Sequence, residues 1–148
     1  MGVYLNPGND KFYKAINSEI YVDKTGLIQY TNRVFNTMQQ NVCVSRPRRF
    51  GKSMTANMLA AYYSRGCQSE KLFEEFKIAK DPSFRQHLNR YNVFFMNMQE
   101  FLSRSKTVEK MILRISQLLM RDLKQEYPDI AYFDETDLAE SMQDVYQH

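Results

Sequence analysis

The 148-residue sequence has few cysteines and no long apolar run, and each absence excludes a class of protein. Its two cysteines, Cys43 and Cys67, are too few for a disulfide framework or a zinc cluster. No apolar run approaches the roughly 18 residues that a membrane-spanning helix needs. Residues 1–8 lack the basic and apolar regions of a signal peptide, and position 6 lacks the Ser or Thr of a myristoylation signal. We therefore expect a reduced, cytoplasmic protein without a membrane partner.

Internal repeats and low-complexity linkers are also missing, so the sequence shows no domain boundary. Apolar residues make up 43% and charged residues 25% of the chain, as in ordinary soluble globular proteins. A domain of this length buries roughly 68–70% of the surface that its unfolded chain exposes, which is enough for a true core. We expect one domain over residues 1–148.

The net charge of +3 conceals an uneven distribution along the chain. The segment from Asp122 to His148 carries eight acidic residues and one lysine, whereas the remainder carries 19 basic and nine acidic residues. Such asymmetry indicates an anionic ligand for the basic part. Charge alone does not separate a nucleotide from a nucleic acid.

Hydrophobic spacing predicts the elements and their order. Helical spacing occurs over residues 10–17, 23–35, 52–65, 69–76, 107–127 and from position 136, and β-prone runs lie at 20–22, 41–45 and 93–98. Cys43 falls in one such run and is expected to be buried, whereas Cys67 follows a helix and is expected to be partly exposed. Alternation of strands and helices predicts an α/β, P-loop-like domain with a parallel sheet flanked by helices. Two central strands are few for such a sheet, so we expect the chain to be the amino-terminal part of a longer protein.

The tripeptide Gly51-Lys52-Ser53 lies between a predicted strand and a predicted helix. It is the second half of the phosphate-binding pattern G-x-x-x-x-G-K-[ST]. Glycine allows the backbone to approach phosphates, and the N–H groups and dipole at the helix start attract the anion. In this pattern Lys52 reaches the β- and γ-phosphates and the Ser53 hydroxyl binds magnesium. The first glycine of the pattern falls on Arg46, so the strict pattern is incomplete.

Arg46, Arg48 and Arg49 join Lys52 in a short stretch that contains no acidic residue. Self-repulsion makes such a cluster unfavourable unless an anion is present. Our main hypothesis is that the anion is a nucleotide phosphate. Two alternatives remain: a solvated basic loop at a helix start, and a nucleic-acid-binding module in which the three arginines contact the backbone phosphates.

Residues 45–53, Ser-Arg-Pro-Arg-Arg-Phe-Gly-Lys-Ser, follow a Tyr-Val-Asp-Lys-Thr segment at 21–25. This combination resembles the AAA-ATPase-like family of bacterial P-loop proteins, in which the loop has this form without the first glycine. The resemblance implies binding of ATP and Mg2+, with Ser53 on the metal. The nucleotide-binding (Walker A) residues that it implies are Arg46, Arg48, Arg49, Phe50, Gly51, Lys52, Ser53 and Met54.

The resemblance has two further implications, one for residues 23–25 and one for the segments that full-length family members contain. Asp23, Lys24 and Thr25 lie where related ATPases place the segment nearest the base. Full-length members continue into a Walker B segment and often into a nuclease-like carboxyl-terminal domain. Such a domain would be a second means of binding nucleic acid.

A Walker B acid should follow a buried strand, where it supports the magnesium ion. The run 93–96 ends in Asn97, which carries no charge. Asp134 and Glu135 follow an apolar run, but the Pro128-Asp129 pair before it and the acidic run after it favour an exposed turn that enters a helix. We therefore assign no catalytic residue and expect ATP binding with little or no turnover, hydrolysis being a property of a complete protein.

Overall fold

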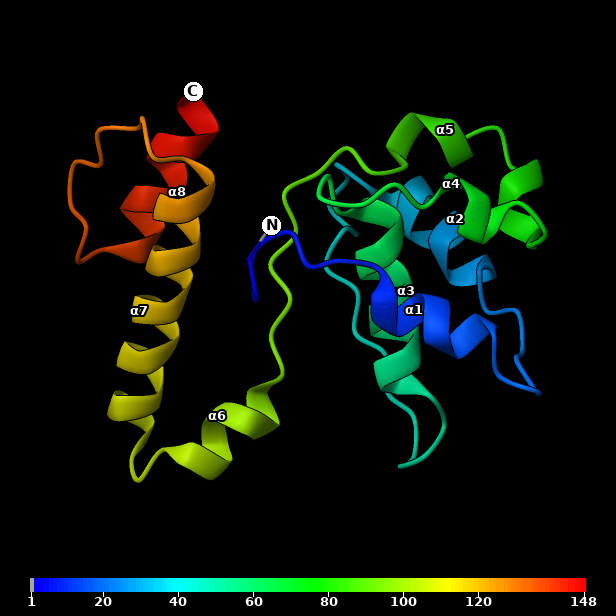
Figure 1. Cartoon of the computed structure of the whole chain (residues 1–148), viewed down its shortest axis with the longest axis horizontal. Helices are drawn as coiled ribbons and strands as arrows, with labels where there is room; N and C mark the ends of the chain where they lie inside the picture. Colours follow the sequence, from blue (N-terminus) through cyan, green and yellow to red (C-terminus); the bar gives the residue numbers. More distant parts are fainter. Residues whose placement is uncertain (1) are drawn as a thin grey trace. The chain divides into compact units, whose positions relative to one another are not determined.

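The computed structural model describes residues 2–148, and about 52% of the chain is helical. It divides into two compact units: unit 1 is the described part of Met1–Asn6 with Phe94–His148, and unit 2 is Pro7–Val93. Unit 2 contains α1 (Asp10–Ile16), α2 (Gly26–Val34), α3 (Lys52–Tyr63), α4 (Glu70–Phe73), the 3-10 helix η1 (Lys77–Lys80) and α5 (Phe84–His87). Unit 1 contains α6 (Met98–Arg104), α7 (Val108–Glu126) and α8 (Leu138–Gln147) (Figure 1). Within residues 2–148, no helix is both long enough and apolar enough to cross a membrane.

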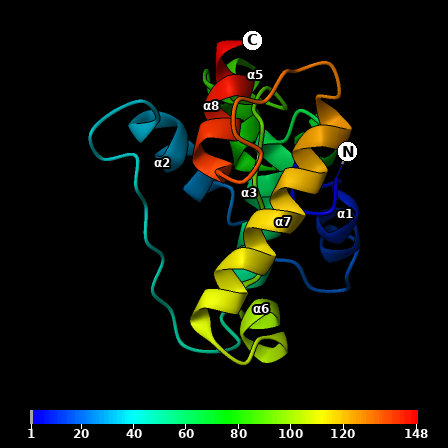
Figure 2. The ribbon, with the colours of Figure 1, turned by 90° about the vertical axis from the view of Figure 1, so that its left-hand side faces the viewer.

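The prediction of an α/β fold with a parallel sheet is wrong for this structure. The described residues form no strand; they form only two isolated bridges, an antiparallel one between Leu5 and Phe94 and a parallel one between Ser64 and Tyr91. Residues 41–45 run as exposed, irregular chain between α2 and α3 (Figure 2). β-prone residues form a strand only where a neighbouring strand satisfies their N–H and C=O groups. Residues 41–45 have no such neighbour in the described part of the chain.

The core of unit 2 is built from aromatic and aliphatic side chains of its short helices. α1 packs on α3, and Phe12 of α1 stacks on Phe73 of α4 with ring centroids 4.7 Å apart. The buried cluster consists of Phe12, Ile28, Met58, Ala61, Tyr62, Phe73, Ile78 and Phe84. The helical spacing that predicted α1, α2 and α3 is confirmed, because the apolar face of each helix contributes to this cluster.

A buried polar network joins α2, α3 and α5 inside that core. The Tyr62 hydroxyl donates to the Phe84 carbonyl at 2.8 Å and accepts from the Asn32 side-chain amide at 3.0 Å. The Asn32 carbonyl oxygen accepts from the Tyr63 hydroxyl at 2.6 Å. Because each buried polar atom finds a partner, the network orients the helices at little desolvation cost.

Unit 1 is organised around α7, with α6 against one end of this helix and α8 against the other (Figures 1 and 2). The predicted long helix at 107–127 is confirmed, and it begins where the Thr107 hydroxyl accepts from the backbone N–H of Lys110 at 3.3 Å. Its carboxyl-terminal half buries Met120 and Leu123 against Leu5. The amino-terminal segment is thus part of the same core as α7.

Candidate functional site

α3 begins at Lys52, immediately after Gly51, which adopts the left-handed conformation with φ 77°. The backbone N–H and the hydroxyl of Thr55 donate to the Gly51 carbonyl at 2.9 and 3.0 Å, and these bonds form the first turn. Among the described residues no side chain caps this end of the helix. The first N–H groups of α3 are therefore left without intrahelical partners at the positive end of its dipole, where an anion binds favourably.

The Lys52 side chain folds back over the loop that precedes α3. Its Nζ donates to the carbonyl of Arg46 and, at 3.4 Å, to that of Pro47. The loop curves around this ammonium group because Arg49, like Gly51, has a positive φ, 68°. Lys52 thus closes a ring of backbone from Arg46 to the start of α3.

Lys24 brings the Tyr-Val-Asp-Lys-Thr segment to the same loop. Its Nζ donates to the Phe50 carbonyl at 3.0 Å. A Cβ placed on Gly51 would lie 2.7 Å from that nitrogen, so the lysine approaches the glycine closely. The two sequence motifs, which are more than twenty residues apart, therefore meet at one loop through Lys24.

Asp23 and Thr25 make different contacts, which hold α2 against η1. The Asp23 carboxylate accepts from the backbone N–H and hydroxyl of Thr25 at 2.8 and 2.6 Å, and from the backbone N–H of Lys77 at 3.0 Å. The Thr25 hydroxyl accepts from the backbone N–H of Ile78 at 3.2 Å. Burial by itself raises the pKa of Asp23, but the hydrogen bonds from Thr25 and Lys77 outweigh it and hold this pKa below its ordinary value. Of the triplet, Lys24 is the residue that contacts the loop.

A cavity of about 270 Å3 adjoins the loop. Its lining is mostly apolar and comes from residues 20–22, Lys24, residues 49–51 and the side of α3 formed by Met54, Thr55 and Met58. An apolar hollow beside a cationic loop suits a ligand that has both an apolar ring and an anionic group.

Comparison with known proteins identifies the family of this chain. Residues 8–148 match the AAA-ATPase-like family model, which is described as a predicted AAA-ATPase. The chain belongs to this family. No curated protein and no solved structure shows significant similarity to it. Membership in the AAA-ATPase-like family is consistent with nucleotide binding in general.

In this AAA-ATPase-like chain the loop arginines are free to meet an anion. Arg46, Arg48 and Arg49 are exposed, and none forms an ion pair with any residue in the range 2–148. Ser53 is exposed in the first turn of α3. Residues 46–54 thus present three guanidinium groups, a lysine and a hydroxyl around one helix terminus.

A metal ion would find few protein ligands here. In the described part of the chain no three His, Cys, Asp or Glu side chains gather as a metal site. The expectation that Asp134 lies in a turn entering a helix is confirmed: its carboxylate accepts from the backbone N–H and hydroxyl of Thr136 at 2.8 and 2.6 Å, just before α8. Glu135 pairs with Lys124. Neither acid follows a strand, as a Walker B acid would.

Sequence reasoning missed Thr55 as part of the loop. Its position four residues after Gly51 is the available signal, because a Thr hydroxyl in a helix can bond the carbonyl four residues earlier. The contact of Lys24 with the Phe50 carbonyl leaves no comparable signal, since it joins distant segments.

Proposed function

We propose that this chain binds a nucleoside triphosphate, ATP with Mg2+, at residues 46–54. The observation that carries the proposal is that Lys52 and Lys24 both donate to carbonyls of one loop at the uncapped start of α3. Two ammonium groups held by neutral carbonyls can exchange these acceptors for phosphate oxygens, whose negative charge attracts a cation more strongly than a neutral carbonyl does.

Each part of the ligand has a matching group in the loop. The N–H groups at the start of α3, with Lys52, suit the phosphates nearest the helix. The arginines at 46, 48 and 49 add charge that can neutralise the outer phosphates. The apolar cavity of about 270 Å3 that Lys24 and Gly51 border suits the base.

The donor set also fits magnesium, with Ser53 as its protein ligand. Mg2+ favours hard oxygen ligands and keeps several waters, so one hydroxyl together with substrate phosphates is a sufficient set. When bound, the ion would neutralise phosphate charge. Because neither Asp134 nor Glu135 follows a strand, neither is placed as a Walker B acid, and we expect binding and positioning with little turnover.

Calorimetric titration of ATP with Mg2+ into the wild-type chain and Lys52→Ala tests the proposal. Lys71→Ala is the matched control, because Lys71 lies on α4 and is exposed. We expect Lys52→Ala to lose binding and Lys71→Ala to retain it, with both variants giving the wild-type circular dichroism spectrum. Binding retained in a folded Lys52→Ala chain would overturn the assignment.

Ser53→Ala distinguishes nucleotide binding from the alternative hypothesis, in which the exposed loop arginines bind nucleic acid. A nucleic-acid surface has no need of this hydroxyl, whereas a magnesium nucleotide does. We expect Ser53→Ala to lower the affinity for ATP in the presence of Mg2+ and to leave the affinity for Mg2+-free ATP unchanged. The alternative is the better description of the loop if two results occur together. Ser53→Ala would change neither ATP affinity, and a variant with Arg46→Gln, Arg48→Gln and Arg49→Gln would no longer bind an oligonucleotide.

A further inference from the structure

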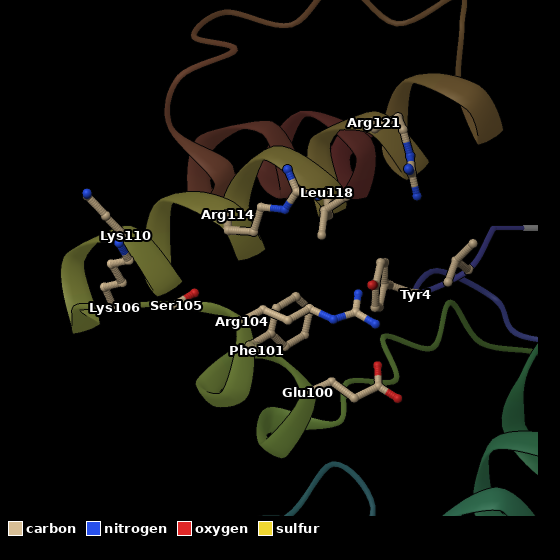
Figure 3. A pocket seen from close by; sticks show the side chains of 11 residues that line it. Tyr4, Glu100, Phe101, Arg104, Ser105, Lys106, Lys110, Arg114, Leu118 and Arg121 are labelled. Atoms are coloured by element: carbon tan, nitrogen blue, oxygen red, sulfur yellow. The ribbon is translucent and has the colours of Figure 1, made fainter.

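Unit 1 contains a groove of about 670 Å3 between α6 and α7, and cations dominate its walls (Figure 3). The basic residues that line it are Arg104, Lys106, Lys110, Arg114 and Arg121. Glu100 is the one acidic residue among the described residues of this lining. None of these side chains belongs to the loop at residues 46–54.

The α7 wall presents its cations in a row. Lys110, Arg114 and Arg121 are spaced four and seven residues apart, with Leu118 between the last two, so they share one helix face. At 1.5 Å of rise per residue the row is about 16 Å long. Arg104 approaches from α6, and its side chain points toward Tyr4 in Figure 3. The charges therefore extend along the groove.

Among the described residues, four of these cations have no compensating partner. Arg104, Lys106, Lys110 and Arg114 form no ion pair with any residue in the range 2–148, and all four are exposed. Like charges one turn apart, such as Lys110 and Arg114, destabilise a helix. A concave surface lined by unpaired like charges gains most from an anion with several charges.

A buried carboxylate holds the fifth cation and the backbone of the adjacent Tyr4. Asp122, whose side chain is 1% exposed, accepts from the Arg121 guanidinium at 3.0 Å and from the backbone N–H of Tyr4 at 2.7 Å. Arg121 remains 48% exposed and lines the groove. Hydrogen bonds thus tie this wall to the amino-terminal segment, with Asp122 as a positioning residue behind it.

Two aromatic rings lie among the cations. Tyr4 and Phe101 have ring centroids 5.6 Å apart, at an angle of 40°, and both line the groove. Phe101 is buried, whereas Tyr4 is half-buried and retains an exposed part. A ring beside a row of cations is the combination by which proteins hold single strands, since bases stack on the ring and phosphates meet the cations.

We propose that the groove between α6 and α7 binds single-stranded nucleic acid, with Arg104, Lys110 and Arg114 on backbone phosphates and Tyr4 as the stacking residue. The row of about 16 Å favours a chain of phosphates over the compact phosphates of one nucleotide. The partly exposed Tyr4 ring favours unpaired bases over a duplex and over an acidic peptide, which has no base to stack. The inference is independent of the nucleotide proposed for the loop, because it uses other residues in the other unit.

Fluorescence anisotropy of a labelled oligothymidylate of about 12 nucleotides, measured at 50 and 200 mM salt, tests this proposal. The full chain carrying Arg104→Gln, Lys110→Gln and Arg114→Gln is compared with a control carrying Lys14→Gln, Lys71→Gln and Arg90→Gln, which removes equal charge from exposed positions of unit 2. Both sets are also made in a chain whose loop arginines are Gln, so that the loop cannot account for the binding.

With three phosphates contacted, the wild-type affinity should fall about twentyfold between the two salt concentrations, since each contact contributes a log–log slope of about 0.7. The groove variant should lose most of this slope and bind far more weakly, while the control retains both. Tyr4→Leu should weaken binding about fivefold or more through lost stacking. ATP binding in calorimetry should be the same in the groove variant and the wild type.

Several results would overturn the proposal. These are absence of binding by the wild-type chain, equal binding by the groove variant and the control, and full affinity in Tyr4→Leu. Equal affinity for a duplex of the same length or displacement by polyglutamate at equal charge would assign the groove to another partner. Displacement by inorganic triphosphate at the oligonucleotide's own concentration would assign it to a free phosphate compound.

Discussion

The buried carboxylate of Asp122 accepts a hydrogen bond from the backbone N–H of Tyr4 at 2.7 Å, across 118 positions of sequence. The same carboxylate accepts from the backbone N–H of Leu5 at 3.2 Å and from Arg121 at 3.0 Å. One side chain of α7 thus fixes the amino-terminal segment and one wall of the basic groove. Burial by itself raises the pKa of Asp122, but the hydrogen bonds from Tyr4, Arg121 and Leu5 outweigh it and lower this pKa from its usual range.

Asp122→Asn should destabilise the chain by about 1–3 kcal/mol at pH 7, because hydrogen bonds to a charged acceptor are lost. The folded pKa lies below the unfolded one, so the stabilisation is present above pH about 4 and is lost as the pH falls through the lowered folded value. Urea unfolding of both chains at pH 7 and near pH 3 measures the difference, which should shrink in acid. Asp129→Asn, at an exposed position of the same charge, is the control and should change little. An unchanged difference between the two pH values would contradict this account.

Gly51→Ala should destabilise the chain by about 1–2 kcal/mol, since an alanine at φ 77° pays the left-handed penalty. Its Cβ would also lie 2.7 Å from the Lys24 Nζ and push this ammonium group away from the loop, so affinity for ATP with Mg2+ should fall in calorimetry. Gly26→Ala is the matched control: a Cβ there meets nothing within 4 Å, and Gly26 is the first residue of α2. We expect Gly26→Ala to stabilise the chain by about 0.4–1 kcal/mol in urea unfolding and to leave ATP affinity unchanged.

Tyr62 should make stability depend on pH at the alkaline end. Burial raises the pKa of Tyr62 to about 12, above its ordinary value near 10. The unfolded chain therefore ionises this hydroxyl first, and stability falls as the pH rises from about 10 to about 12. Tyr62→Phe should be less stable by about 1–2 kcal/mol at pH 8 through loss of its bonds to Phe84 and Asn32, and this gap should narrow toward pH 12. The measurement is urea unfolding followed by circular dichroism across this pH range. A stability difference between the wild type and Tyr62→Phe that stays constant with pH would show that Tyr62 does not cause the loss of stability.

The two cysteines should differ strongly in reactivity, in the order opposite to the one the sequence pattern predicts. Cys43 is exposed, whereas Cys67 is 7% exposed and its Sγ donates to the Pro7 carbonyl at 3.2 Å. Burial raises the pKa of the Cys67 thiol, which leaves less of the reactive thiolate. One thiol per native chain should react quickly with a disulfide reagent at pH 8. Cys43→Ser should abolish that fast phase and Cys67→Ser should preserve it; the reverse result would place residues 41–45 in a buried strand.

Local features of the fold were predictable because helices depend on neighbours in sequence. The start of α3 at Lys52 follows from the glycine before it, and the extent of α7 follows from its apolar spacing and its Thr107 cap. The turn at Asp134 before α8 was predictable for the same reason. In each case the deciding hydrogen bonds join residues at most four positions apart.

The loop at residues 46–54 was recognisable from its sequence pattern, but the contact with Lys24 was not. Two sets of contacts depend on how α2 packs. They are the hydrogen bond of Lys24 to the Phe50 carbonyl, and the hydrogen bonds of Asp23 and Thr25 with η1. The basic groove could not be predicted from the sequence, because its cations are separated by other residues along the chain. Only the placement of α6 against α7 brings them together.

By itself, the sequence determined the helices α1, α2, α3, α7 and α8 and the family to which the chain belongs. Tertiary structure alone decided that the β-prone run at 41–45 stays exposed and pairs with no strand among the described residues. It also decided that Cys67 is the buried thiol and that Asp122 joins residues 4 and 5 to α7. The physical reason is the range of the interactions. A helix satisfies its backbone within itself, whereas a strand, a buried thiol or a buried carboxylate requires partners that only the folded chain brings near.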